Sequence, residues 1–421
     1  MRKIVLVLGM HRSATSLTTE LLSSYGLYVG EKEDLCKPNQ NNQRGYFENR
    51  SAVWLNNKIL YEHGMHWADL SEDITKRMET KYTPEITVIL QKMIDQAEDS
   101  QTLLLKDPRM CLVEPIWKEQ IKQIGLEEHI VMVFRHPYEV AKSIEVRDHI
   151  DFSYSLKLWF YNNFSALCSM AECDTPILVL NHNNYFSAYE EQIDKIETFL
   201  NWSGSNNELN KIIDVSLRHN NVKEIQTEIN ARLKSMVLEL YDYLIELSLM
   251  KQVVIRREKL MRLSGFLKEM MHFSYSEGND DMPPTVFRGT LGKEKKHWCA
   301  YQLENNKKLL VSGFQQICEE QGVKELSVYG NGTLARALLP ILDVSGIHII
   351  AVYDKNPLDV GQSIHVCGIQ ETSLIDGMIL NTAVNYGEQV KNELIAKSAT
   401  CKVIDLYELL YAMLKGYKNI I

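Results

Sequence analysis

Apolar residues in the first half of the chain occur in short runs separated by stretches of helical periodicity. The runs are short, continuous and rich in β-branched residues, which is typical of strands buried on both faces; they cover residues 4–8, 102–105, 130–134 and 177–180. Helical patterns begin near Thr15 and recur at 138–146, 154–170 and 190–200. This alternation predicts an α/β fold with a parallel, doubly wound sheet over residues 1–220.

A region of mainly helical periodicity follows, and we assign it residues 221–322. Apolar residues three and four apart predict one long amphipathic helix over 222–250, and a second is predicted over 256–271. The two predict a helical hairpin, with a coiled-coil dimer as the alternative. Residues 274–296 are polar and contain glycine and proline, which favours a linker or loop, and 298–320 is again helical.

The remaining residues, 323–421, have the pattern of a small Rossmann-like domain. A strand at 326–329 precedes Gly330 and Gly332, a helix reaches 342, and a strand at 347–353 ends at Asp354. Further strands are predicted near 378–380 and 402–404. This order fits a dinucleotide fingerprint for NAD. Because only half of a full Rossmann domain is expected, we favour a degenerate domain that binds a nucleotide sugar, a partner or nothing.

Composition narrows the functional classes. The chain has 421 residues and a formal net charge of −9, so cations that bind an anion have to be gathered locally, and nonspecific nucleic-acid binding is disfavoured. The eight cysteines form no C-x-x-C pair and no zinc-type cluster, so no metal site is predicted and a reducing compartment is favoured. With no signal-like or membrane-spanning run, we predict a cytoplasmic protein.

The segment between the first strand and its helix has the character of an anion-binding loop. Unpaired amide groups and the helix dipole favour an anion there. Hydroxyls and one arginine add donors, and the loop reads Gly9, Met10, His11, Arg12, Ser13, Ala14, Thr15, Ser16. A Walker A loop would require a lysine after its second glycine, and neither is present.

Several ordered blocks of the first 220 residues resemble the bacterial branch of the sulfotransferase family. Besides the loop, these are Gly45-Tyr-Phe-Glu48-Asn49, Leu105-Lys106-Asp107-Pro108-Arg109, the block 134–143 and the block 216–219. The resemblance implies a P-loop-like fold that binds 3′-phosphoadenosine 5′-phosphosulfate. The loop would hold the 5′-phosphosulfate, Arg135 and Ser143 the 3′-phosphate, and Arg218 with His219 would close over the nucleotide. The family usually has glycine at Ala14, so a positive φ there would strain this chain.

The implied reaction is sulfuryl transfer to an acceptor hydroxyl. Catalysis then rests on positioning and on cations near the leaving phosphate, for which we predict Arg12 and Lys106. Glu48 is the predicted base and His11 its rival. The resemblance favours a carbohydrate or glycan acceptor. The alternatives are a nucleotide-dependent kinase or phosphotransferase on the same scaffold, and a non-catalytic nucleotide-binding module.

Overall fold

The computed structural model describes residues 1–38, 42, 44–70, 82–172, 174–202, 212, 229–273, 292–355, 366–368, 377–397 and 401–415. The chain forms two compact units. Unit 1 comprises Met1–Leu60 and Trp67–Ser274, and unit 2 comprises Tyr61–His66 and Tyr275–Ile421. Each unit is built on its own parallel sheet.

Unit 1 contains a four-stranded parallel sheet in the order β2-β1-β3-β4. The strands are β1 (Lys3–Leu8), β2 (Leu103–Lys106), β3 (Glu127–Phe134) and β4 (Ile177–Asn181). All four apolar runs are therefore strands, and the predicted α/β class with a parallel sheet is confirmed. The central strand β1 lies between β2 and β3, so the loop that follows β1 leaves the middle of the sheet.

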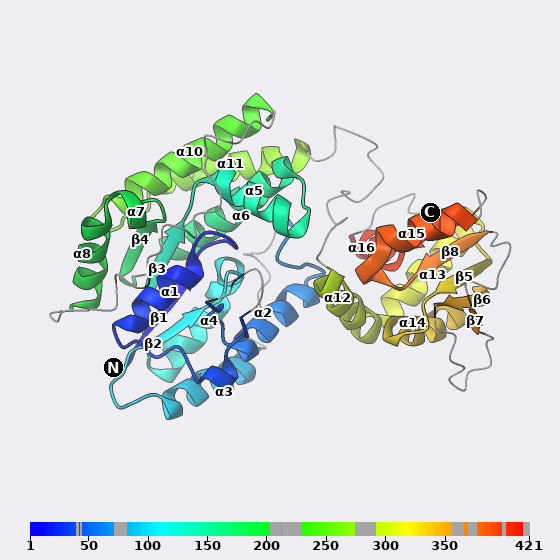
Figure 1. Cartoon of the computed structure of the whole chain (residues 1–421), viewed down its shortest axis with the longest axis horizontal. Helices are drawn as coiled ribbons and strands as arrows, with labels where there is room; N and C mark the ends of the chain where they lie inside the picture. Colours follow the sequence, from blue (N-terminus) through cyan, green and yellow to red (C-terminus); the bar gives the residue numbers. More distant parts are fainter. Residues whose placement is uncertain are drawn as a thin grey trace. The chain divides into compact units, whose positions relative to one another are not determined.

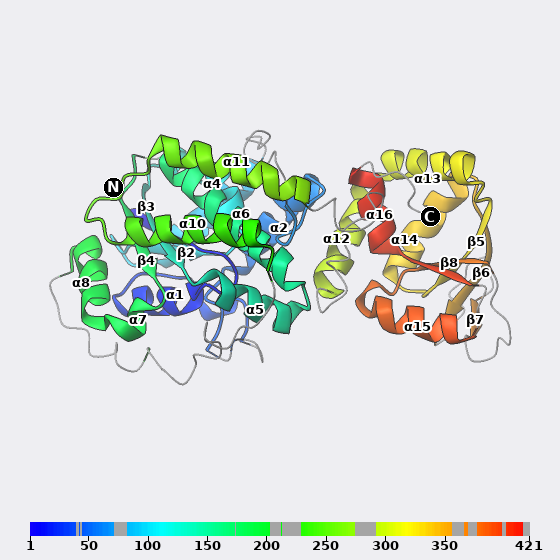
Figure 2. The same ribbon diagram turned by 90° about the horizontal axis from the view of Figure 1, so that it is seen from above.

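Helices connect these strands and cover both faces of the sheet (Figure 1). They are α1 (Thr15–Ser24), α2 (Arg50–Glu62), α3 (Thr83–Gln96), α4 (Met110–Ile124), α5 (Pro137–Asp148), α6 (Phe152–Ala171), α7 (Asn184–Ser187) and α8 (Tyr189–Leu200), with a short 3₁₀ helix η1 (Lys32–Asp34). On one face, Val5, Val7 and Val133 pack in a cluster with Leu21 of α1 and Ile196 of α8. Alternate strand residues are buried on the other face, where α4 and α6 contact the strands (Figure 2).

Helices α10 (Ala231–Ser248) and α11 (Arg257–Phe273) form the predicted hairpin. The ion pairs Arg232–Glu269 and Arg256–Glu246 link the two arms of the hairpin, one pair near each end of it. Both helices pack on α6, and α10 also contacts β4, so the hairpin belongs to unit 1 and not to a separate helical region. The apolar stripes are used for intramolecular packing.

The first of these helices begins later than its apolar periodicity predicts. Asn230 has non-helical backbone angles, and its side chain accepts hydrogen bonds from the amides of Arg232 and Leu233. This is an N-cap, and Ile229 therefore lies before the helix. Residues 222–228 of the predicted helix lie outside the described residues.

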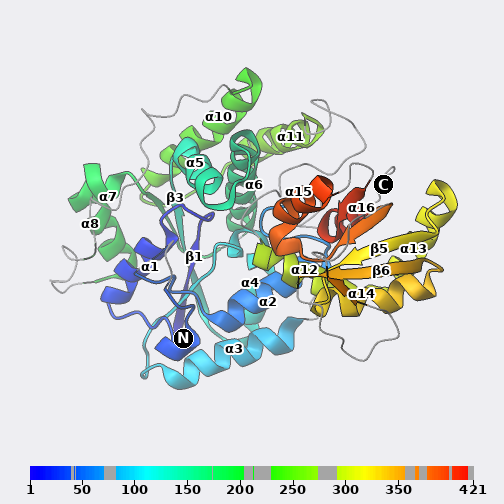
Figure 3. The same ribbon diagram turned by 45° about the vertical axis from the view of Figure 1, so that its right-hand side comes forward.

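Unit 2 contains a five-stranded parallel sheet in the order β7-β6-β5-β8-β9. Its elements are α12 (Gly292–Asn305), α13 (Lys307–Gln321), β5 (Glu325–Tyr329), α14 (Thr333–Val344), β6 (His348–Asp354), β7 (Val366–Gly368), β8 (Met378–Asn381), η7 (Val384–Tyr386), α15 (Gly387–Lys397), β9 (Lys402–Asp405) and α16 (Leu406–Lys415). Helices α14 and α15 lie on opposite sides of the strands (Figure 3).

Three details of unit 2 differ from the sequence prediction. Strands β8 and β9 extend the sheet on the far side of β5, so the sheet has more than half of a Rossmann arrangement, including the point at which strand order reverses. The helix predicted over 298–320 is two helices, because the chain leaves helical geometry at Asn306. Of the predicted loop 274–296, residues 292–296 belong to α12, and 274–291 lie outside the described residues.

Candidate functional site

The site lies at the carboxyl edge of the unit 1 sheet. Because the strands are parallel, the segments that leave β1, β2 and β3 emerge at the same edge. These segments are the loop that starts at Gly9, the segment 107–109 and the residues that start at Arg135. The sheet order therefore brings together three of the blocks that carry the family resemblance.

The loop after β1 has positive φ angles, which glycine adopts without strain and alanine does not. Gly9 has φ +153°, and a Cβ there would lie 2.5 Å from the carbonyl oxygen of Val133, so glycine is required. Ala14 has φ 70° and ψ 25°, a left-handed conformation that favours glycine. The strain anticipated for alanine at this position is present. The conformation turns the chain into α1.

The N-terminus of α1 retains unused hydrogen-bonding capacity. Ala14, at the cap position, provides no side-chain acceptor for the first-turn amides. The Ser13 hydroxyl is fully buried and has no hydrogen-bond partner. Buried polar groups in folded proteins are nearly always paired, so this orphaned hydroxyl at a helix N-terminus fits a ligand with acceptor oxygens.

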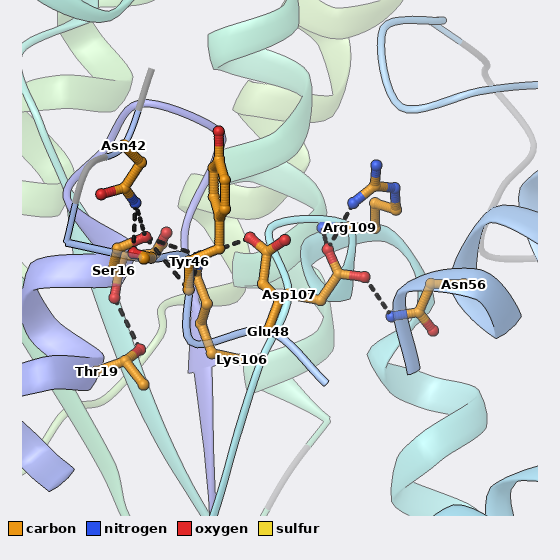
Figure 4. A network of polar contacts seen from close by, with 11 residues as sticks. Ser16, Thr19, Asn42, Tyr46, Glu48, Asn56, Lys106, Asp107 and Arg109 are labelled. Atoms are coloured by element: carbon orange, nitrogen blue, oxygen red, sulfur yellow. Dashed lines mark hydrogen bonds and ion pairs between the residues drawn. The ribbon is translucent and has the colours of Figure 1, made fainter. Parts of the chain in front are cut away.

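Lys106 and Glu48 form a buried ion pair beside the loop (Figure 4). Lys106 Nζ donates to Glu48 Oε1 at 2.6 Å, to the Tyr46 carbonyl at 3.0 Å and to Ser16 Oγ at 3.2 Å. Asn42 Nδ2 also donates to Ser16 Oγ, at 3.1 Å. The ammonium group of Lys106, at the end of β2, thus links Glu48, the predicted base, to Ser16 in the first turn of α1.

The next residues along the chain form a second network. Asp107 is fully buried, and its Oδ1 pairs with Arg109 Nη1 at 2.9 Å (Figure 4). Its Oδ2 accepts from Asn56 Nδ2 at 2.8 Å, and Arg109 Nε donates to Asn57 Oδ1 at 2.6 Å. Both carboxylate oxygens of Asp107 are therefore engaged with protein groups.

The residues predicted to hold a second phosphate lie against the loop. Arg12 Nε donates to Ser143 Oγ at 2.7 Å, although 131 residues separate the two. Arg135 pairs with the fully buried Glu139 at 2.7 Å. Helix α5 begins at Pro137, as its sequence predicts, which orients Ser143 toward the loop.

Cations converge on the buried imidazole of His11. Burial lowers the pKa of His11 well below its ordinary value, and the positive charges of Arg109, Arg147, Lys106 and Arg12 lower it further, in that order. Burial also lowers the pKa of Arg12 to about 10, with Arg147 and Arg135 contributing. Mutually repelling cations are typical of a site that binds an anion.

The surroundings of the His11 ring bear on its chemistry. His11 Nε2 is buried and has no hydrogen-bond partner, and the ring lies 4.3 Å from Trp67 between centroids. One nitrogen of the imidazole is therefore available to a ligand.

Sequence reasoning did not single out two residues that take part in this arrangement. Arg147 lies one helical turn beyond Ser143 on α5, and that spacing is the signal that could have identified it. Cys111, which accepts a hydrogen bond from the Gly9 amide at 3.2 Å, has no comparable local signal.

Other predicted residues lie elsewhere. Arg218 and His219 lie outside the described residues, so their role stays a prediction. Gly330, Gly332 and Asp354 are in unit 2, where Asp354 Oδ2 accepts the Asn331 amide at 2.6 Å. Asp354, the predicted acidic residue of the dinucleotide fingerprint, thus accepts a hydrogen bond from the glycine loop itself.

Two features are absent from the residues that the structure describes. Within the ranges that the structure describes, no group of three or more His, Cys, Asp or Glu residues is placed to hold a metal ion. In the same part of the chain, no helix has the length and apolar character needed to cross a membrane.

Comparison with known proteins adds two structural similarities. No protein-family model matches the chain. No curated protein matches it either. One similar structure is the sulfotransferase domain of the Synechococcus PCC 7002 olefin synthase, at 13% identity and a TM-score of 0.34, over 58% of this chain and 96% of that domain. Another is the sulfotransferase domain of the curacin biosynthetic pathway, at 15% identity and a TM-score of 0.33, over 64% and 98%.

Both are sulfotransferase domains.

Proposed function

We propose that this protein is a sulfotransferase that uses 3′-phosphoadenosine 5′-phosphosulfate. The observation that carries the proposal is the orphaned Ser13 hydroxyl and His11 Nε2, both buried, in a loop around which cations gather. Such a loop is suited to an anion with several acceptor oxygens. We propose that the 5′ end of the nucleotide is held by the loop residues Gly9, His11, Arg12, Ser13, Ala14, Thr15 and Ser16.

Arg135 and Ser143 would bind the 3′-phosphate. The support is that both lie beside the loop: Arg12 donates a hydrogen bond to Ser143, and the charge of Arg135 contributes to the lowered pKa of Arg12. The bound nucleotide supplies an activated sulfuryl group on a phosphate leaving group. Arg12 and Lys106 would stabilise the negative charge that develops there.

Glu48 is the proposed base for the acceptor hydroxyl. Its Oε1 is held by Lys106, which fixes the carboxylate at the edge of the loop. His11 is less suited, because burial and four neighbouring cations oppose protonation of its ring. The proposed acceptor is a carbohydrate hydroxyl, on the sequence resemblance alone.

A magnesium-dependent kinase is the second candidate, and the site residues disfavour it. The loop has no lysine, and Asp107, the carboxylate nearest the end of β2, uses both oxygens for Arg109 and Asn56. A metal-binding aspartate would need at least one oxygen for the ion.

Thermal stability with added nucleotides tests the proposal. A ligand that binds only the folded state raises the melting temperature. We expect 3′-phosphoadenosine 5′-phosphate to stabilise the protein without magnesium and ATP to do so more weakly, because ATP lacks the 3′-phosphate. Equal shifts with both nucleotides, or a shift that requires magnesium, would contradict the proposal. Transfer of labelled sulfate from the sulfonucleotide to a panel of sugars then tests turnover and acceptor.

A further inference from the structure

Arg147 lies beside the anion loop, the segment of residues 9–16 in unit 1. It is in the last turn of α5, four residues after Ser143, so both side chains lie on one face of that helix. Ser143 Oγ accepts from Arg12 Nε at 2.7 Å. The face of α5 that meets the loop therefore continues to Arg147.

Trp67 connects Arg147 to the loop by a second route, which also lies within unit 1. Arg147 Cζ lies over a ring of Trp67, 5.6 Å from its centre, and the His11 and Trp67 ring centroids are 4.3 Å apart. Only 3% of the tryptophan is exposed. A guanidinium over a buried aromatic face is attracted to it and held in place. Two routes thus bring Arg147 to the loop, one to His11 and one to Arg12.

Asp148 completes the surroundings of the guanidinium. Its Oδ2 accepts from Arg147 Nε at 2.7 Å, and Arg147 Nη2 lies 2.6 Å from the same oxygen. Asp148 is buried. A buried ion pair is by itself weak evidence for a functional role, so the place where its charge acts has to decide.

The charge of Arg147 acts on the loop in spite of this pairing. Burial lowers the pKa of Arg12 to about 10, and of the neighbouring charges that of Arg147 contributes most, ahead of Arg135. Asp148 raises the same pKa, but by less than Arg147 lowers it. The pair therefore leaves a net positive potential at Arg12. Two cations that repel one another destabilise the empty site, and a bound anion relieves this repulsion.

The position of Arg147 along α5 favours the 5′ end of the nucleotide over its 3′-phosphate. Arg135 lies two residues before α5, whereas Arg147 lies one turn beyond Ser143, or about 6 Å further along the helix. Both routes from Arg147 end at His11 and Arg12, which belong to the loop proposed for the 5′ end. That end carries a phosphate and the sulfuryl group attached to it. The planar fork of a guanidinium matches the oxygens of such tetrahedral anions.

We propose that Arg147 binds the sulfuryl group of the nucleotide and that Trp67 is the positioning residue that holds its guanidinium there. The inference rests on the proposed function and deepens it. In the transfer, the bond from sulfur to the 5′-phosphate oxygen breaks, and its electron pair stays on that oxygen. A bond from sulfur to the acceptor oxygen forms, and the hydroxyl proton goes to Glu48. Arg147 contacts the group that moves, whereas Arg12 and Lys106 serve the phosphate that leaves.

Two nucleotides that differ in the sulfuryl group provide the test. Calorimetry without acceptor compares 3′-phosphoadenosine 5′-phosphosulfate with 3′-phosphoadenosine 5′-phosphate. Arg147→Met removes the charge and its donors and keeps an unbranched apolar side chain. It should weaken binding of the sulfonucleotide by about 10- to 100-fold, the range of hydrogen bonds to charged groups, and should change that of the bisphosphate little. Trp67→Phe should produce the same selectivity, and combining the two changes should add little, since both act on one guanidinium.

Three results would overturn the proposal. Equal weakening of both nucleotides would show a general effect of charge, and weakening of the bisphosphate alone would place Arg147 at the 3′-phosphate. Unchanged affinities together with a lower melting temperature would show that the ion pair serves only the fold. Arg232→Met is the matched control, because Arg232 also has a carboxylate partner, Glu269, and an aromatic ring, Phe266, at 5.2 Å, but is exposed on α10. It should leave both affinities unchanged.

Two further measurements keep the test decisive. If Arg147→Met fails to fold, Arg147→Met with Asp148→Asn replaces it, because this variant leaves no buried carboxylate without its cation. If the unaltered protein binds neither nucleotide, the proposed function fails, and inorganic sulfate then tests the anion site alone. At constant ionic strength, sulfate should raise the melting temperature of the unaltered protein and of Arg232→Met more than that of Arg147→Met. Equal shifts in all three would refute an anion site at Arg147.

Discussion

A buried pair of carboxyl groups predicts an unusual dependence of stability on pH. Glu114 of α4 is fully buried, and Glu128 of β3 is nearly so. Burial, followed by the charge of Glu128, raises the pKa of Glu114 to about 8. Ser169 of α6 donates a hydrogen bond to Glu114. Glu114 is therefore expected to keep its proton at neutral pH in the folded protein.

The direction of the pH dependence follows from the difference in the pKa of Glu114 between the folded and the unfolded chain. The unfolded chain releases this proton near the ordinary pKa of 4.5, whereas the folded chain releases it near 8. The stabilisation that comes from this bound proton is complete below pH 4.5. It decreases as the pH rises above 4.5 and is lost once the pH has passed 8. The two pKa values correspond to a loss of at most about 5 kcal/mol across that range.

Replacing Glu114 with glutamine should remove most of this loss. Glutamine is neutral at every pH and can still accept from Ser169, so Glu114→Gln should equal the original protein near pH 5. Near pH 8 the variant should be more stable, by about 2 kcal/mol or more. The pH at which the two stabilities diverge is a specific consequence of the buried proton.

The assay is denaturant-dependent hydrogen exchange of peptides from α4 and β3 between pH 5 and 9. Following these peptides isolates unit 1, because a two-unit protein does not unfold in one step. Glu119→Gln is the control: Glu119 is exposed on the same helix and should leave the slope unchanged. If the original protein shows no loss of stability between pH 5 and 8, or if Glu114→Gln keeps the same slope, the reasoning is refuted.

Three further predictions concern the site. Ala14→Gly should raise the stability of unit 1 by up to about 1 kcal/mol, as measured by chemical unfolding, because glycine adopts φ 70° without strain; a loss of stability would contradict this. Gly9→Ala should abolish nucleotide binding, measured by calorimetry, because its Cβ would lie 2.5 Å from the Val133 carbonyl; retained affinity would show that the loop can move. Glu48→Gln should lower turnover by about 10²–10⁴-fold with little change in nucleotide affinity, whereas Arg135→Ala should weaken that affinity; full turnover in the first would remove Glu48 as the base.

The sequence by itself determined the elements of the fold and the nature of the loop. The four strands of unit 1 could be predicted because parallel strands covered on both faces require continuous apolar runs. Pro137 marked the start of α5 because its ring suits the first helical position. Gly9 and the hydroxyl residues after it marked an anion loop, since helix N-termini leave amides unpaired.

Only the tertiary structure decided which of these residues meet. Lys106 and Glu48 are 58 residues apart, and Arg12 and Ser143 are 131 apart, and no local pattern encodes either pair. The sheet order β2-β1-β3-β4 brings them together. Periodicity reports which face of an element is buried, whereas the partner of that face depends on strand order and on contacts between distant parts of the chain.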